Sequence, residues 1–175
     1  PVPDQFTKLA NDPEYQALIK AMDARLTKAV KARRVAKISD PEFFPEGIAY
    51  DPKGKQLFIA SMRDGRIWKL SLSGKQRPFN AGEAIPRLGL TINPKGELCT
   101  VETNGFLKAA ESKRINRLRC FTINSGQPAR SVMVPDADQL NDLVFTADGT
   151  AYLSDSGGGA IAPALMMGAG GVAAG

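Results

Sequence analysis

The sequence contains no histidine, and this absence excludes several kinds of chemistry. Among 175 residues there are only two cysteines, Cys99 and Cys120. Serine-histidine-aspartate and cysteine-histidine triads, HExxH zinc helices and histidine general bases all require an imidazole. Two cysteines are also too few for a four-cysteine zinc site or an iron-sulfur cluster. Any metal bound by the chain is therefore expected to have oxygen ligands.

Long apolar runs are absent as well. A membrane-spanning helix needs about 18 or more consecutive apolar residues. The uncharged segment 157–175 is dominated by Gly and Ala and is interrupted by Pro163. The sequence therefore predicts no membrane span. A content of 43% hydrophobic and 23% charged residues is ordinary for globular chains, so we expect a packed core.

Positive charge is concentrated near the start of the sequence. Residues 1–40 carry eight Lys or Arg against five Asp or Glu, which gives +3 of the total net charge of +5. An amphipathic helix is predicted over 12–34, with Asp12 as N-cap and Pro13 at its first position. Its apolar residues recur at steps of three or four: Tyr15, Leu18, Ile19, Met22, Leu26 and Val30. The basic end of this helix complements the helix dipole, and no aromatic-basic pattern accompanies it. We favour a helix docked on a domain over one that binds an anionic surface or a partner, and we predict no nucleic-acid partner.

After residue 40 the hydrophobic period changes from that of a helix to that of strands. Two apolar runs, 57–62 and 66–70, flank an Asp-Gly turn at Asp64 and predict an antiparallel hairpin. With Met62 opposite Ile67, both faces of this hairpin are apolar. A sheet that is apolar on both faces needs neighbours in front and behind, which favours stacked blades or a sandwich.

An internal repeat favours the blades. The segment 47–54, Gly-Ile-Ala-Tyr-Asp-Pro-Lys-Gly, recurs 42 residues later at 89–96 as Gly-Leu-Thr-Ile-Asn-Pro-Lys-Gly, and more loosely at 142–149. Repeats of about 40–50 residues built from short strands are typical of propeller blades. We therefore predict an all-β fold, a partial β-propeller of about three blades, preceded by the amphipathic N-terminal α-helix. The expected organisation is a helical segment at 1–40, the partial propeller at 41–160 and a disordered Gly/Ala-rich tail at 161–175.

The two cysteines fall opposite each other in the second repeat. A hairpin centred near Ala110 places Cys99 opposite Cys120 and Val101 opposite Leu118. A cross-strand disulfide is one interpretation, and buried free thiols that behave as small hydrophobes are the interpretation we favour here. For the whole chain we favour a secreted or periplasmic location over a cytoplasmic one.

Two motifs in these repeats resemble a known family. Phe-Pro-Glu-Gly-Ile-Ala-Tyr-Asp-Pro at 44–52 and Leu-Asn-Asp-Leu-Val-Phe at 140–145 resemble the senescence marker protein, gluconolactonase and luciferin-regenerating enzyme family, and the likeness covers about 43–160. The resemblance implies a six-bladed propeller. It also implies a divalent metal, Ca²⁺ or Zn²⁺, at the end of the central channel, and hydrolysis of sugar lactones or related esters.

The resemblance further implies roles for two residues. Glu46 is similar to the family's first-blade metal ligand, and Asn141 to the third-blade asparagine that faces metal-bound water or substrate. Independently, the repeat places Glu46, Leu88 and Asn141 at equivalent positions before the innermost strands, which line the channel. A turn carboxylate that caps backbone amides and a loop-bonding asparagine are the alternative interpretations.

Two departures from the family pattern leave the function open. The family's remaining ligands lie in later blades beyond this sequence, and Gln139 stands where members can have a substrate-binding arginine. The chain is therefore expected to be either a metal-dependent lactone or ester hydrolase, whole or as an inactive fragment, or a non-catalytic scaffold for a small molecule or protein. Open blade edges also predict self-association.

Overall fold

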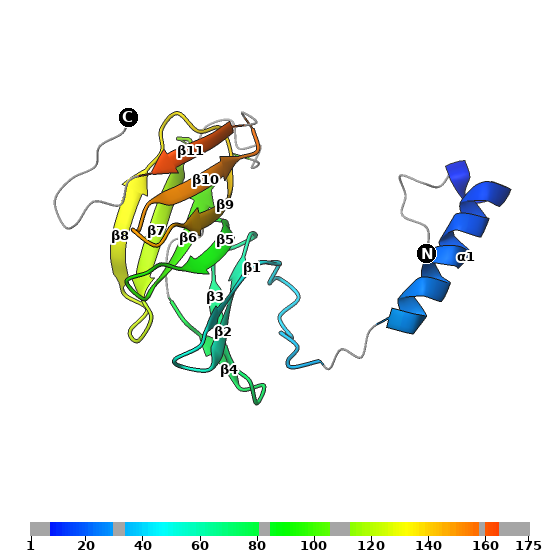
Figure 1. The fold of residues 1–175 in the computed structure, drawn as a ribbon, viewed down its shortest axis with the longest axis horizontal. Helices are drawn as coiled ribbons and strands as arrows, with labels where there is room; N and C mark the ends of the chain where they lie inside the picture. Colours follow the sequence, from blue (N-terminus) through cyan, green and yellow to red (C-terminus); the bar gives the residue numbers. More distant parts are fainter. Residues whose placement is uncertain (1–7, 30–33, 81–84, 106–112, 158–159, 165–175) are drawn as a thin grey trace. The chain divides into compact units, whose positions relative to one another are not determined.

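The chain forms two compact units, residues 1–34 and residues 35–175, in the computed structural model shown in Figure 1. The structure describes residues 8–29, 34–80, 85–105, 113–157 and 160–164. Each unit is described by itself below.

The first unit contains the predicted helix, α1, Pro13–Ala29. The Tyr15 backbone N–H donates a 3.0 Å hydrogen bond to Oδ1 of Asp12, which confirms the N-cap. Leu18 and Met22 of the apolar stripe are both about half exposed or more. No helix in the described ranges is both long enough and apolar enough to cross a bilayer.

The second unit consists of three antiparallel sheets in which consecutive strands are neighbours. Figure 1 shows that the inner strands β1, β5 and β9 follow one another across these sheets. The arrangement matches the expected two blades and part of a third. The first sheet is β1 (Pro45–Asp51), β2 (Gln56–Ser61), β3 (Ile67–Ser71) and β4 (Gln76–Pro78); the second is β5 (Arg87–Ile92), β6 (Glu97–Thr103), β7 (Asn116–Thr122) and β8 (Pro128–Met133); the third is β9 (Leu140–Phe145), β10 (Ala151–Asp155) and β11 (Ala160–Ala164).

The first hairpin forms, but its predicted register is wrong. Ile67 lies opposite Ala60 rather than Met62. The reason is Gly65, which adopts the left-handed conformation with φ of 68° and closes a turn over 62–65 by donating to the Ser61 carbonyl at 3.1 Å. Both faces of the hairpin still carry apolar side chains, so the prediction that its sheet needs neighbours in front and behind is unaffected by the change of register.

The middle sheet packs on both of its faces, as stacked blades require. Between the first and second sheets lie Ala49, Phe58, Ala60, Ile67, Leu90, Leu98 and Phe121. Between the second and third lie Leu88, Cys99, Val101, Leu118, Cys120, Ala137, Leu140, Leu143, Ala151 and Leu153. Burial of these side chains supplies the main favourable free energy of the fold.

The cysteines form a disulfide, so the favoured interpretation of free thiols is wrong. Cys99 and Cys120 are directly paired across β6 and β7, and Val101 pairs with Leu118, as predicted. The two sulfurs lie together on one side of this ladder, and both residues are fully buried. Buried side chains are expected both for two free thiols and for a disulfide, so the predicted burial of Cys99 and Cys120 did not distinguish the two interpretations.

The third sheet extends past the boundary expected at residue 160. Residues 160–164 form β11, which pairs with β10, and Pro163 lies opposite Tyr152. Strand pairing uses backbone groups, so this segment pairs although its side chains do not alternate. Proline is tolerated because β11 is an edge strand. Residues 165–175, the remainder of the expected tail, lie outside the described residues.

Candidate functional site

The three inner strands carry the same backbone irregularity. Three steps along the inner strand, over 45–48, 87–90 and 140–143, are matched by only two steps along the neighbouring strand. Such a two-against-one mismatch is a β-bulge, which bends the strand and redirects the side chains within it. The repeat therefore reproduces a specific local geometry as well as a strand order.

The predicted ligand positions lie within these bulges. Glu46, Leu88 and Asn141 are each the second residue of an inner strand, because each strand begins two residues earlier than the sequence indicated. Glu46 is exposed, Asn141 is half-buried and Leu88 is buried in the core. Two of three equivalent positions thus present oxygen-bearing side chains outside the core.

Close approach between the inner strands brings these positions to one end of the unit. A Cβ added to Gly47 would lie 2.6 Å from the Leu88 carbonyl oxygen of β5. A Cβ added to Gly89 would lie 3.1 Å from the Asn141 carbonyl oxygen and 2.2 Å from Oδ1 of Asp142. Glycine is required at both positions because the next strand occupies the space of a side chain. The strand β5 therefore lies between Glu46 and Asn141, and all three bulges are at the same end.

Glu46 lies in an electrostatic environment suited to a cation. Although the Glu46 residue is exposed overall, partial desolvation of its carboxylate raises its pKa, and repulsion from the Asp142 carboxylate raises the pKa further. Among the described residues, the Glu46 carboxylate makes no hydrogen bond or ion pair. Asp142 was not among the predicted site residues; it lies on β9, where its N–H donates a 3.0 Å hydrogen bond to Ser154 Oγ. The other two repeats have glycine, Gly47 and Gly89, at the position of Asp142, and this difference is the sequence signal that could have identified Asp142 as a site residue.

Asn141 is oriented by one hydrogen bond. Its Nδ2 donates to Ser156 Oγ at 2.9 Å. That bond leaves the amide carbonyl oxygen of Asn141 without a partner among the described residues. An amide oxygen is one of the ligands that hard divalent cations accept.

The backbone that leads into each ligand position is held by the end of the neighbouring strand. In the third sheet, Asp155 accepts 2.8 Å hydrogen bonds from the N–H groups of Asp138 and Gln139. In the first sheet, Ser61 Oγ accepts a 3.3 Å bond from the N–H of Phe44. Asp155, at the end of β10, is therefore a positioning residue for the loop before β9.

The equivalent position in the second sheet holds an ion network instead. The fully buried Glu102 accepts hydrogen bonds from Arg87, at 2.8 and 2.7 Å, and pairs through its other oxygen with Arg117. Burial lowers the pKa of Arg87, which is 2% exposed, although Glu102 opposes that shift. Both carboxylate oxygens of Glu102 are paired with these guanidinium groups, so we assign the network a structural role.

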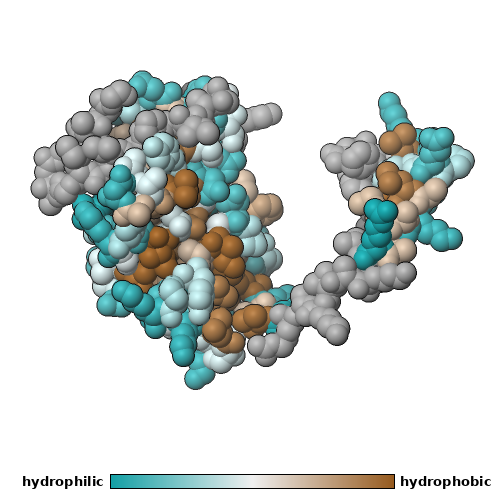
Figure 2. All heavy atoms as spheres, in the orientation of Figure 1, coloured by the Kyte–Doolittle hydropathy of each residue, from teal (hydrophilic) through white to brown (hydrophobic). Residues whose placement is uncertain are grey.

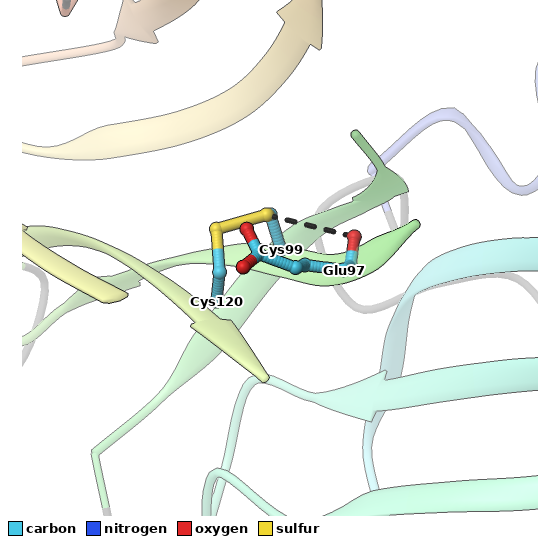
Figure 3. Close-up of side chains that lie close together, drawn as sticks. All are labelled: Glu97, Cys99 and Cys120. Carbon is cyan, nitrogen blue, oxygen red and sulfur yellow. Dashed lines mark hydrogen bonds between the residues drawn. A yellow bond between two sulfur atoms is a disulfide. The ribbon is translucent and has the colours of Figure 1, made fainter. Parts of the chain in front are cut away.

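A second group of potential ligands, Glu97 with Cys99 and Cys120, does not form a metal site (Figure 3). The two sulfurs are bonded to each other, so neither is a thiolate. The Glu97 carboxylate accepts hydrogen bonds from Arg130 at 2.9 Å and from Asn93 at 2.8 Å. These partners satisfy the carboxylate within the protein.

Solved structures identify the architecture of the sheets. The sequence matches no family model, and no curated protein matches it either. The chain is similar to a streptogramin B lyase (TM-score 0.55, 16% identity, 73% of this chain and 42% of that one). It is also similar to virginiamycin B lyase from Staphylococcus aureus (0.56, 19%, 74% and 40%) and to the nidogen/laminin complex (0.53, 19%, 64% and 40%).

The chain thus spans about two fifths of the length of these neighbours. The neighbours are β-propeller proteins, and at 16–19% identity the likeness is one of fold. Together with the three antiparallel sheets and α1, it shows a partial all-β propeller with an N-terminal helix.

Proposed function

We propose that Glu46 and Asn141 bind a divalent cation at the channel end of this propeller, and that the cation serves hydrolysis of a sugar lactone or related ester. The observation that carries the proposal is the Glu46 carboxylate, which has no partner among the described residues and lies in the field of Asp142. A cation placed between these groups would relieve their repulsion. The family resemblance of the two motifs that contain Glu46 and Asn141 supports the same assignment.

The donor set fits a hard cation. Carboxylate and amide oxygens suit Ca²⁺, whereas Zn²⁺ in proteins is usually held by histidine and cysteine, neither of which is available here as a free ligand. Bound at this site, the cation would polarise the lactone carbonyl and acidify a bound water. Glu46 and Asn141 would hold the cation, and Asn141 would also contact the substrate. The Asp142 carboxylate would accept a proton from the attacking water as the water oxygen adds to the carbonyl carbon, and would return that proton to the alcohol oxygen as the ester C–O bond breaks.

A non-catalytic scaffold is the second candidate. The described residues offer two or three protein oxygens, from Glu46, Asn141 and Asp142, which are fewer than the six to eight ligands that Ca²⁺ takes. In this alternative the channel end binds a small molecule or protein without turnover. In either case we propose a secreted or periplasmic location, because the disulfide would persist in an oxidising compartment.

Metal-dependent thermal stability tests the proposal. A ligand that binds only the folded state raises its stability, by about 2.7 kcal/mol at a hundredfold excess over Kd. We expect Ca²⁺ to raise the Tm of the wild-type chain and to leave Glu46→Gln unchanged. Glu42→Gln is the matched control, since Glu42 is an exposed carboxylate of the same unit whose partner is Arg63.

Each outcome separates the candidates. A Tm increase that Glu46→Gln abolishes, followed by turnover in a lactone screen, supports the hydrolase. The same increase without turnover favours the scaffold. No increase with either Ca²⁺ or Zn²⁺, or an increase that persists in Glu46→Gln, would refute the metal site.

A further inference from the structure

Within the described residues of the propeller unit, two sheet faces expose apolar side chains. On the first sheet, Ile48 and Tyr50 point away from the second sheet and are 61% and 48% exposed; we call this the β1 face. On the third sheet, Val144 and Tyr152 point away from the second sheet and are 61% and 41% exposed; we call this the β9 face. Figure 2 shows hydrophobic surface gathered around the inner strands of this unit.

Ile48 on the β1 face is equivalent to the residues through which the second and third sheets pack on the sheet that precedes each of them in the chain. Ile48 is the fourth residue of β1, as Leu90 is of β5 and Leu143 is of β9. Leu90 packs against the first sheet, and Leu143 packs against the second. The β1 face is therefore one half of an interface that the chain already forms twice.

The β9 face corresponds to the other half of this interface, the half on which the next sheet of the chain packs. Val144 and Tyr152 are paired across β9 and β10, as Ala49 and Phe58 are paired across β1 and β2. Ala49 and Phe58 are buried where the second sheet packs on the first. The β9 face is thus the surface on which a following sheet would pack.

A recess on the β9 face marks where such a side chain would enter. Its volume is about 350 Å³, and its lining is Asp142, Leu143, Val144, Tyr152, Leu153 and Ser154. Most of these residues are apolar or aromatic. A recess of this kind suits an aliphatic side chain such as Ile48, which protrudes from the other end of the same unit.

We propose that a second copy of this chain docks its β1 face on the β9 face, with its Ile48 entering the recess beside Val144 and Tyr152. Each copy carries both halves of the interface, so the contact is head-to-tail and can be made twice. Two copies related by a two-fold axis along the channel then close a ring of six sheets. This proposal does not depend on the cation.

Two charge substitutions on opposite faces test the contact. Ile48→Arg blocks the β1 face and Val144→Arg blocks the β9 face, and each residue is exposed enough for the fold to tolerate arginine. In sedimentation velocity over a concentration series, the wild-type chain should associate and each variant alone should be monomeric. An equimolar mixture of the two variants should associate again, because each supplies the face that the other lacks.

Controls keep the result specific. Met133→Arg changes a residue of β8 that is 49% exposed and lies outside both faces, so it should associate like the wild type. Circular dichroism and Tm show that each variant is folded. A wild-type chain that stays monomeric at every concentration would overturn the proposal. So would association that survives either single substitution, since a face that packs on its own copy needs only one of the two surfaces.

Discussion

The disulfide between β6 and β7 should contribute a large share of the stability of the propeller unit. Cys99 and Cys120 are 21 residues apart in sequence. In the chain-entropy model, closing a loop of that length removes about 11 cal/mol/K from the unfolded ensemble, or about 3 kcal/mol at room temperature. Whole domains are stable by only about 5–15 kcal/mol. Loss of the bond should therefore lower Tm by roughly 10 °C for a unit of this size.

The assay compares one protein in two redox states. The chain is unfolded and refolded with or without a reductant, because both sulfurs are buried and the folded protein shields them. Thermal denaturation then measures the difference with no heavy atom removed. A Cys99→Ala, Cys120→Ala double variant is the control, and reductant should not change its Tm.

Three results would contradict this reasoning. Alkylation with mass spectrometry that finds two free thiols in protein refolded without reductant would show that the bond does not form. Equal Tm values in the two redox states would show that the bond forms without constraining the unfolded chain. A difference that also occurs in the double variant would assign the effect to the reductant itself.

Three further substitutions test other features. Glu102→Gln leaves the buried Arg87 guanidinium without its charge partner, so urea denaturation should show a loss of about 3–5 kcal/mol; a loss below about 1 kcal/mol would mean that the network is hydrated. Gly47→Ala sets a methyl group 2.6 Å from a β5 carbonyl and should cost about 1–3 kcal/mol in the same assay, and no loss would contradict the close strand approach. A hydrogen bond from Arg66 holds the pKa of Asp40 below its usual 3.8, so the stability that it adds is present above that pH and lost as pH falls through the folded-state pKa. Asp40→Asn should flatten acid denaturation in this range, and an unchanged acid profile would refute the coupling.

The strand order and the equivalence of the blades could be predicted from the sequence because the repeat encodes them locally. The Asp-Pro-Lys-Gly and Asn-Pro-Lys-Gly turns fix where each inner strand ends, and their 42-residue offset aligns Glu46 with Leu88. The first hairpin register could not be predicted in this way, since it depends on the left-handed Gly65. The strand β11 was missed because backbone pairing needs no side-chain pattern.

The candidate site was predictable only in part. Glu46 and Asn141 follow from the repeat and from the motifs around them, and the structure brings them to one end of the unit. Asp142 was not identified, because its effect on Glu46 depends on the approach of β1, β5 and β9 in space rather than on sequence spacing. The disulfide was missed for a different reason: the register predicts that the sulfurs are adjacent, but whether they bond depends on redox conditions.

The repeated bulge also bears on how such a domain can diversify. A carboxylate, an aliphatic chain and an amide occupy the same bulge position in three sheets, and the backbone register is the same in each. A substitution there changes the chemistry at the channel end without shifting a strand. Descendants of a uniform tandem array could therefore acquire an asymmetric site one blade at a time, while the scaffold that displays it stays constant.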